Sequence, residues 1–169
     1  LLHNMSALDI DPGKIDAVFI SHHHFDHIGG LAAFLQANPN VTVYAPPLLR
    51  GITRAKEVVY VEKPMSLSPN VFSTGELAGI EQSLCVKLDD GLVVIVGCSH
   101  PGVAKILDAA KQFGEPTQLI GGFHGFDNFE LLAPLKLICP THCTQHQKEI
   151  FELYPQTTTQ GGGGKTIQL

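Results

Sequence analysis

The chain has 169 residues and a formal net charge of −5, with 44% hydrophobic and 16% charged residues. This length fits one domain with its own core, and the composition is typical of a globular protein rather than a disordered one. The longest apolar runs, such as Leu92–Val96, are far shorter than the roughly 20 residues that span a membrane. We therefore expect a single domain over residues 1–169, with no membrane partner and, given the acidic balance, no nucleic-acid partner.

Four cysteines in a chain of this length are too few for a disulfide scaffold, and Cys98 and Cys143 stand close to histidines. We therefore expect a reducing compartment and place the protein in the cytoplasm. The segment Leu1–Met5 lacks the charged and apolar regions of a signal peptide. The histidines are numerous and unevenly placed, since four of the nine lie within residues 21–27.

The first half of the chain predicts two strands and a helix between them. Residues 16–20 form an apolar run after a turn at residues 11–13, which indicates a buried strand. Residues 29–37 carry apolar side chains at helical spacing and stop at Asn38-Pro39-Asn40, so we expect a helix there. Residues 41–45 predict the second strand. Residues 48–77, with scattered Pro, Gly and Ser, predict no clear element.

The second half continues the alternation. Residues 84–88 and 92–96 flank Asp89-Asp90-Gly91, which is a strong hairpin signal. After the hairpin we expect a helix at 102–113, a strand at 117–120, a short helix at 128–135, a strand at 137–139, a helix at 145–154 and a last strand at 165–169. Strands that alternate with helices predict an α/β or a layered α+β domain.

Histidines come directly after four of the predicted strands. These are His22 and His24 after the first strand, then His100, His124 and His142 after the strands that end near residues 96, 120 and 139. Because strand ends at one edge of a sheet converge in space, and ligands bind at such edges, these separate segments predict one shared site.

The run His22-His23-His24-Phe25-Asp26-His27 has the pattern His-x-His-x-Asp-His. His22 and His24 lie two apart at a strand end, so their rings point to the same side and suit one metal ion. Asp26 and His27, after the chain turns, suit a second ion. Imidazole with carboxylate favours zinc, with manganese or iron as alternatives. The competing interpretation is a surface histidine cluster or a run left by an affinity tag. A tag would lack the intervening Asp26, and a polar cluster this dense beside Phe19-Ile20 needs a partner to offset its desolvation.

The remaining histidines are weaker candidates one by one. We expect His100 to complete the first ion's ligands, His142 to complete the second's, and His124 to bridge or flank the two. Each of these histidines has the alternative of a helix-capping, core or surface role. A structural zinc site built from Cys98, Cys139, His142 and Cys143 is a further alternative, although paired Cys-x-x-Cys motifs are absent. The run Gly161–Gly164 lacks the first glycine and the following helix of a phosphate-binding loop.

The run from His22 to His27, followed by Gly29-Gly30-Leu31, resembles the signature of the metallo-β-lactamase superfamily. Motifs at residues 97–102, 121–124 and 141–144 are similar to the branch named after dihydropterin ribofuranosyl-aminobenzene phosphate synthase. The resemblance implies an αββα sandwich with one or two metal ions at the sheet edge. It assigns His22, His24 and His100 to the first ion and Asp26, His27 and His142 to the second. It places His124 where many relatives carry a bridging aspartate.

Relatives begin with strands that precede the segment corresponding to Leu1, so the resemblance implies an N-terminally truncated sandwich. An incomplete sheet exposes a strand edge that favours pairing with another chain. We therefore predict a homodimer formed through that edge.

The expected function is that of a metallohydrolase with two divalent ions, zinc before manganese or iron, acting on an ester or phosphoester small molecule. In this hypothesis the ions lower the pKa of a shared water, and Asp26 binds metal and orients the resulting hydroxide as the catalytic residue. Ser99 and Thr141 hold the ligand loops, and Thr144 or Lys165 contacts an anionic group of the substrate. A phosphate-containing, pterin-type substrate is one possibility.

Three alternatives stay open. The first is a lactonase, thioester hydrolase or phosphodiesterase of the same fold. The second is a catalytically silent metal-binding or interaction module, and the third is a di-iron redox protein.

Overall fold

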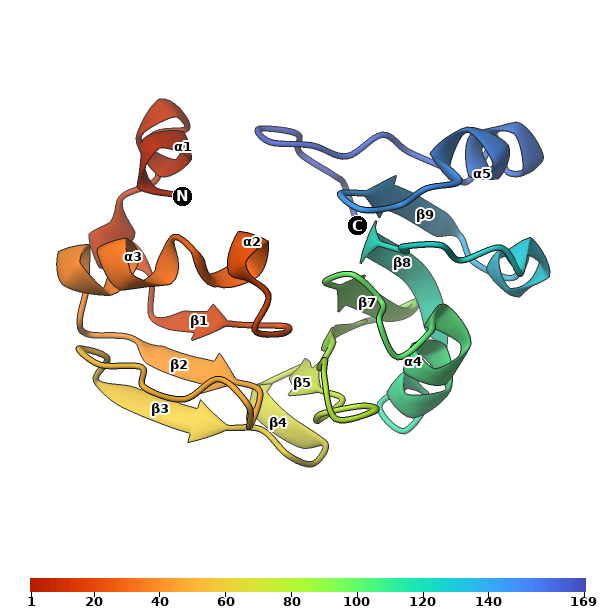
Figure 1. Ribbon diagram of the computed structural model, residues 1–169. Helices are drawn as coiled ribbons and strands as arrows, with labels where there is room; N and C mark the ends of the chain where they lie inside the picture. The colour runs from red at the N-terminus through yellow and green to blue at the C-terminus, as the bar shows by residue number, and fades with distance from the viewer.

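The computed structural model describes all 169 residues and contains two β-sheets with helices on their outer faces (Figure 1). The helical segments are α1 (Leu2–Ala7), η1 (Pro12–Lys14), α2 (Phe25–Ile28), α3 (Leu31–Ala37), α4 (Val103–Ala110), η2 (Phe129–Leu132) and α5 (Gln147–Leu153). The strands are β1 (Ala17–Phe19), β2 (Thr42–Ala45), β3 (Glu57–Tyr60), β4 (Met65–Ser68), β5 (Val71–Ser73), β6 (Leu84–Leu88), β7 (Gly91–Val96), β8 (Pro116–Gly122) and β9 (Leu137–Thr141).

The smaller sheet has three parallel strands in the order β1-β2-β3. Its buried residues alternate along β2, so that Val43 and Ala45 join Phe34 and Leu35 of α3 in one apolar cluster. That alternation is what a strand with a single covered face requires. The cluster therefore holds α3 against the sheet and sets the position of the segment between β1 and α3.

The larger sheet has the order β4-β5-β6-β7-β8-β9. Its first four strands are antiparallel neighbours, and β7, β8 and β9 run parallel to one another. The main core lies between this sheet and α4 and α5, and it is a cluster of 14 buried residues that includes Val94, Leu119, Ile138, Ile106 and Ile150. Because β7, β8 and β9 are parallel, their carboxyl ends meet at one edge of the sheet.

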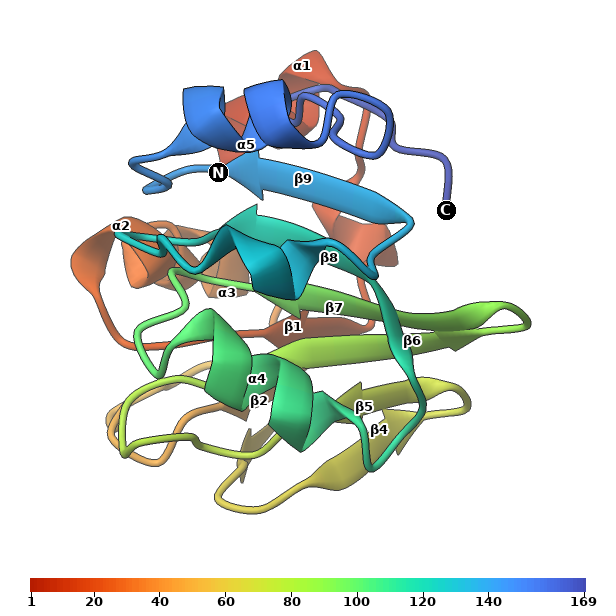
Figure 2. The same cartoon turned by 90° about the vertical axis from the view of Figure 1, so that its right-hand side faces the viewer.

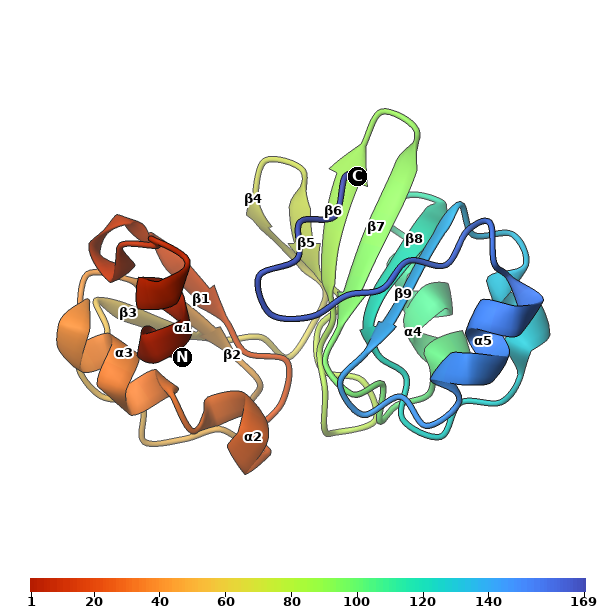
Figure 3. The same cartoon turned by 90° about the horizontal axis from the view of Figure 1, so that it is seen from above.

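The layers follow the order helix, sheet, sheet, helix that was predicted from the sequence. Figure 3 shows α4 and α5 on the side of the larger sheet that faces away from β1–β3. Figure 2, viewed from that side, shows α5 above β9 and α4 below β7 and β8. The loop after β1 and the ends of β7 and β9 therefore approach one another between the two sheets.

The smaller sheet ends at β1, whose second edge has no neighbouring strand. Strand edges of this kind are sites of pairing with other chains. The homodimer predicted from the sequence stays a prediction, since it concerns a partner chain. No helix is both long and apolar enough to cross a membrane.

Several predicted elements differ from the structure. Residues 48–77 hold three strands, β3, β4 and β5, each only three or four residues long. The predicted strand at 165–169 is wrong, because those residues pair with no strand and the second edge of β9 is occupied by Thr158, which bridges to Ile138. The helices α1 and α2 were not predicted, and both are too short for a clear period.

Candidate metal centre

The His-x-His-x-Asp-His segment begins three residues after β1 ends and runs into α2. His24 occupies the N-cap position of α2 with extended backbone angles, and Asp26 lies in the first turn. This turn sends His22 inward, where it is fully buried, and leaves the Asp26 side chain 57% exposed. The short helix thus separates one buried ligand candidate from one that solvent reaches.

Three imidazoles of the first predicted set lie close together at the sheet edge. The ring centroids are 4.6 Å apart for His22 and His24, 4.9 Å for His22 and His100, and 4.7 Å for His24 and His100. All three pairs are edge-to-face, with interplanar angles of 77° to 79°. Mutually perpendicular rings at these separations can direct one nitrogen each toward a common point.

Two ring nitrogens in this set have no hydrogen-bond partner although they are buried, namely Nε2 of His22 and Nε2 of His100. Burying a polar atom without a partner is unfavourable, so such atoms are uncommon in folded proteins. The other nitrogen of His22, Nδ1, lies 3.0 Å from Oγ of Ser21. When Nδ1 carries the proton and donates to that oxygen, Nε2 presents a lone pair to the centre, as a metal ligand does.

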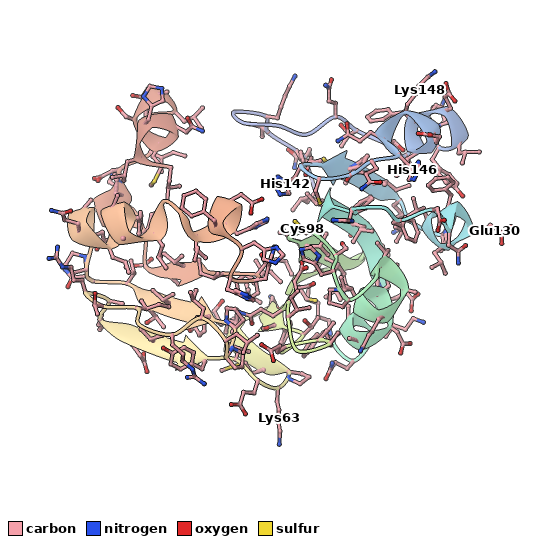
Figure 4. The ribbon with its side chains drawn as sticks, in the orientation of Figure 1. Lys63, Cys98, Glu130, His142, His146 and Lys148 are labelled. Atoms are coloured by element: carbon pink, nitrogen blue, oxygen red, sulfur yellow. The ribbon has the colours of Figure 1, made fainter.

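The second predicted set converges even more closely. Oδ2 of Asp26 lies 3.1 Å from Nε2 of His142 and 3.5 Å from Nε2 of His27, and the two imidazole nitrogens are 3.1 Å apart. His142 has a left-handed backbone angle, φ 50°, at the end of β9. Figure 4 shows His142 beside Cys98, whereas His146 lies near α5.

The loop after β7 is held by the buried carboxylate of Glu81, which has no exposed surface. Its Oε1 accepts hydrogen bonds from the backbone N–H groups of Gly97, Cys98 and Ser99 at 3.0 to 3.1 Å, and its Oε2 accepts from His100 N–H at 2.9 Å. Four donors on one carboxylate fix the loop that carries Cys98 and His100, because charge-assisted hydrogen bonds are stronger than neutral ones.

The neighbouring residue, Gln82, is also fully buried and contacts the other sheet. Its backbone N–H donates to the Ser21 carbonyl at 2.9 Å, and its Nε2 donates to the Ile20 carbonyl at 2.9 Å. Its Oε1 accepts from the Ser73 hydroxyl at 2.7 Å. The pair Glu81-Gln82 therefore joins the loop after β7 to the segment that leads into His22, and so sets the spacing between the two ligand-bearing loops.

The protonation of the site favours neutral imidazoles. Burial, followed by the charges of His27 and His100, lowers the pKa of His22 from 6.5 to about 3. Burial also lowers the pKa values of His27 and His100. Desolvation alone would raise the pKa of Asp26, but its own backbone hydrogen bond and the charge of His27 outweigh that effect and lower it. Neutral imidazole with ionised carboxylate is the protonation state that binds metal.

We expect acid to destabilise the metal-free protein. Between pH 6.5 and about 3 the unfolded chain binds a proton at His22 while the folded chain does not, so the unfolding free energy falls as pH falls through this window. His27 and His100 shift in the same direction and add to the slope. Melting temperatures of chelator-treated protein, measured in half-unit steps from pH 7 to pH 4, check this expectation.

The quantity to compare between variants is the slope of melting temperature against pH, not the melting temperature itself. His22→Gln removes the titrating group and should flatten the slope. His146→Gln is the matched control, because that histidine is half-exposed and paired with Glu149, so the slope should persist. A melting temperature that stays level down to pH 4 in the unsubstituted protein would contradict the prediction.

The structure places the other predicted residues as follows. Two groups of donor atoms lie within 4.8 Å of one another, namely His22, Cys98 and His100 in one group and His27, Cys98 and His142 in the other. His124 is exposed, with its ring centroid 5.3 Å from that of His100, and like His24 and Asp26 it belongs to neither of these converging groups. Its role as a metal ligand stays a prediction. Ser99 Oγ donates to the Gly122 carbonyl at 2.7 Å, which ties the loop after β7 to the end of β8.

Thr144 and Thr141 have structural hydrogen bonds. Oγ1 of Thr144 makes two hydrogen bonds, because it accepts one from Phe123 N–H and donates one to the Thr141 carbonyl. A hydroxyl with both roles occupied and little exposure is not free to bind an anionic substrate group. His3 is exposed, His146 is half-exposed, and Lys165 lies in the exposed C-terminal segment.

All four cysteines are free. The alternative zinc site does not assemble around Cys139 and Cys143, because the converging groups contain Cys98 and His142 but neither of these two residues.

Sequence reasoning missed Glu81 and Gln82 altogether and used Cys98 only in that alternative. No spacing rule marks a lone carboxylate whose partners are backbone groups 16 to 19 residues away. The available signal was the Glu-Gln pair itself, two large polar residues that only Ser83 separates from the start of β6.

Open space flanks the converging residues on both sides. A cavity of about 370 Å³ lies between the sheets and is lined by Phe19, His27, Ile95 and His142, among others. A second cavity of about 430 Å³ is lined by His100, His124, Phe123 and Phe126, among others. Both have room for a small molecule whose polar group reaches the imidazoles.

Comparison with known sequences finds a matching family and similar proteins. The family model described as the metallo-beta-lactamase superfamily matches residues 1–104. The 7,8-dihydropterin-6-methyl-4-(beta-D-ribofuranosyl)-aminobenzene-5'-phosphate synthase of Methanocaldococcus jannaschii is 25% identical over 214 residues, which covers 88% of this chain and 73% of that protein. The hydroxyacylglutathione hydrolase of Aeromonas hydrophila is 40% identical over only 48 residues, 28% of this chain and 18% of that protein.

Two solved structures share the fold. A metal-dependent hydrolase of the beta-lactamase superfamily superposes with a TM-score of 0.72 at 24% identity, covering 99% of this chain and 84% of that one. The metallo-beta-lactamase fold protein YhfI from Bacillus subtilis has a TM-score of 0.62 at 14% identity, covering 91% and 78%. Since the family model matches more than half of the chain and the layered fold is shared, this protein belongs to the metallo-beta-lactamase superfamily.

Proposed function

We propose that this chain is a metal-dependent hydrolase in which a dinuclear, zinc-type site activates water against an ester or phosphoester. The observation that carries the proposal is the pair of buried, unpartnered Nε2 atoms on His22 and His100, next to the cluster of Asp26, His27 and His142. These polar atoms come from both sheets and meet at one edge, where a cation would satisfy all of them.

The residues divide into two sets by their positions. His22, His24 and His100 would hold one ion, and Asp26, His27 and His142 would hold the other. Divalent ions bound there supply Lewis acidity and lower the pKa of a bound water toward 7. Asp26 is the exposed acceptor of the cluster, so its second carboxylate oxygen is available to take a hydrogen bond from water and orient it.

An anionic, phosphate-containing substrate is the class that the site favours. The chain itself is acidic, with a net charge of −5, so attraction for an anion must come from bound cations. The relative from Methanocaldococcus jannaschii is named a phosphate synthase, which supports the same class. Phe123 and Phe126 line one of the flanking cavities and suit an aromatic or alkyl portion of such a substrate.

The test is metal content per chain, measured by mass spectrometry on protein purified without a histidine tag or chelator. We expect about two ions per chain and hydrolysis of at least one activated phosphoester or carboxylic ester by the loaded protein. One ion per chain would overturn the dinuclear part of the proposal. Two ions without turnover on any ester would favour a catalytically silent module, and an iron-loaded, coloured preparation would favour a di-iron redox protein.

A further inference from the structure

Nε2 of His27 has more close neighbours than hydrogen bonding explains. It lies 3.5 Å from Oδ2 of Asp26, 3.1 Å from Nε2 of His142 and 3.2 Å from Sγ of Cys98. A ring nitrogen offers either one proton or one lone pair, so it makes a single well-directed hydrogen bond. Three polar atoms at this range around one nitrogen are typical of ligands that share an ion.

The separations also fit a tetrahedral ion. With zinc–nitrogen and zinc–oxygen distances of about 2.0–2.1 Å and a zinc–sulfur distance of about 2.3 Å, neighbouring ligand atoms of a tetrahedron are roughly 3.3–3.6 Å apart. Four of the six separations among Asp26, His27, His142 and Cys98 are 3.1 to 3.5 Å, and Sγ of Cys98 lies within 4.8 Å of a ring nitrogen of His142. Sγ of Cys98 also lies within 4.8 Å of the ligand nitrogens of His22 and His100.

The surroundings of Cys98 set it apart from the other cysteines. Cys98 is 4% exposed, and its backbone is fixed by the hydrogen bond to Glu81. Sγ of Cys98 also belongs to the converging group that contains His22 and His100. His22 is fully buried, and its Nε2 has no hydrogen-bond partner. The thiol therefore lies between the two histidine sets.

We propose that Cys98 is the fourth protein ligand of the ion held by Asp26, His27 and His142. This inference rests on the proposed metal centre and adds a thiolate to it. A sulfur–metal bond forms as the thiol proton passes to solvent, with no change of oxidation state. The second ion then has four protein ligands, as closed sites do, while the ion at His22, His24 and His100 keeps an open position for water and substrate.

A thiolate ligand changes which metal the site selects. Soft sulfur donors favour zinc, cobalt(II) and iron over magnesium and manganese. The proposal therefore predicts that manganese binds the second position more weakly than zinc does.

Cobalt(II) titration of the metal-free protein tests the proposal, because a cobalt–thiolate bond absorbs strongly in the near ultraviolet and a cobalt–imidazole bond does not. We expect that absorption in the unsubstituted protein and its loss in Cys98→Ser, with affinity for the second equivalent lowered at least ~10-fold. Cys143→Ser is the matched control. Its sulfur donates to the Cys98 carbonyl from 3.8 Å but belongs to neither converging group, so the absorption should persist.

The outcomes separate this inference from the proposed function. Two bound cobalt ions without the thiolate absorption would overturn the role of Cys98 and leave the metal centre intact. No cobalt binding at all would overturn both. If Cys98→Ser does not fold, X-ray absorption of the zinc-loaded, unsubstituted protein decides the question, since a sulfur neighbour at about 2.3 Å supports the proposal and a shell of only nitrogen and oxygen overturns it.

Discussion

Replacing Glu81 with alanine is expected to lower the unfolding free energy by about 4 kcal/mol or more, because each buried N–H group left without an acceptor costs about 1–3 kcal/mol. Four N–H groups, from Gly97 to His100, lose their acceptor at once. For a domain of this size such a loss corresponds to a decrease of about 10 °C or more in melting temperature. Chemical denaturation and thermal melting of the metal-free protein measure it.

Glu81→Ala should also weaken metal binding, because the loop it releases carries His100 and Cys98. Glu81→Gln separates the two effects. The amide keeps the size of the side chain and one acceptor oxygen, but it presents an NH₂ group to at least one of the backbone donors. We therefore expect Glu81→Gln to have an intermediate loss of stability and a loss of metal affinity of about 10-fold or more, as for other residues that orient ligands.

Glu130→Ala is the matched control for these substitutions, since Glu130 is an exposed carboxylate in η2, well away from the site (Figure 4). It should change the unfolding free energy by less than about 0.5 kcal/mol. A Glu81→Ala protein that melts within about 2 °C of the unsubstituted one would show that solvent or a rearranged loop satisfies the freed N–H groups.

Local sequence patterns predicted the part of the site whose residues directly follow strands. His22 and His24 follow β1, and His100 and His142 follow β7 and β9. A buried strand has a local sequence signal, and parallel strands bring their ends to one edge of the sheet. A residue that directly follows such a strand can therefore be placed at that edge from the sequence alone. The same reasoning placed His124 after β8, yet a left-handed turn, φ 48°, leaves that residue exposed.

The part that local patterns did not predict depends on contacts between distant segments. Glu81 and Gln82 have no periodic context, and their role follows from backbone groups of two loops that only the folded chain brings near. The strands β4 and β5 are short and contain serine, so their pairing with neighbours rather than their own propensity defines them. Residues 165–169 show the converse, because an apolar alternation without a free neighbouring edge forms no strand.

The other large effect is expected from removing the first set of imidazoles. His22→Ala combined with His24→Ala should reduce the bound metal from two ions to at most one per chain, and turnover should fall by about 10³-fold or more. Lewis acidity supplies several kcal/mol of transition-state stabilisation, and each 1.36 kcal/mol is a factor of ten in rate. Metal analysis and initial rates on the best ester found in the screen give both numbers.

His142→Ala tests the second set by the same measurements, with one ion retained at the first position and activity lowered. The matched control is His146→Ala, four residues along the chain, where the imidazole pairs with Glu149 at 3.4 Å and faces neither cavity. That variant should keep two ions and full turnover. Activity that survives the loss of His22 and His24 would mean that the reaction does not use these ligands, because no other three imidazoles in the chain have all their ring centroids within 5 Å of one another.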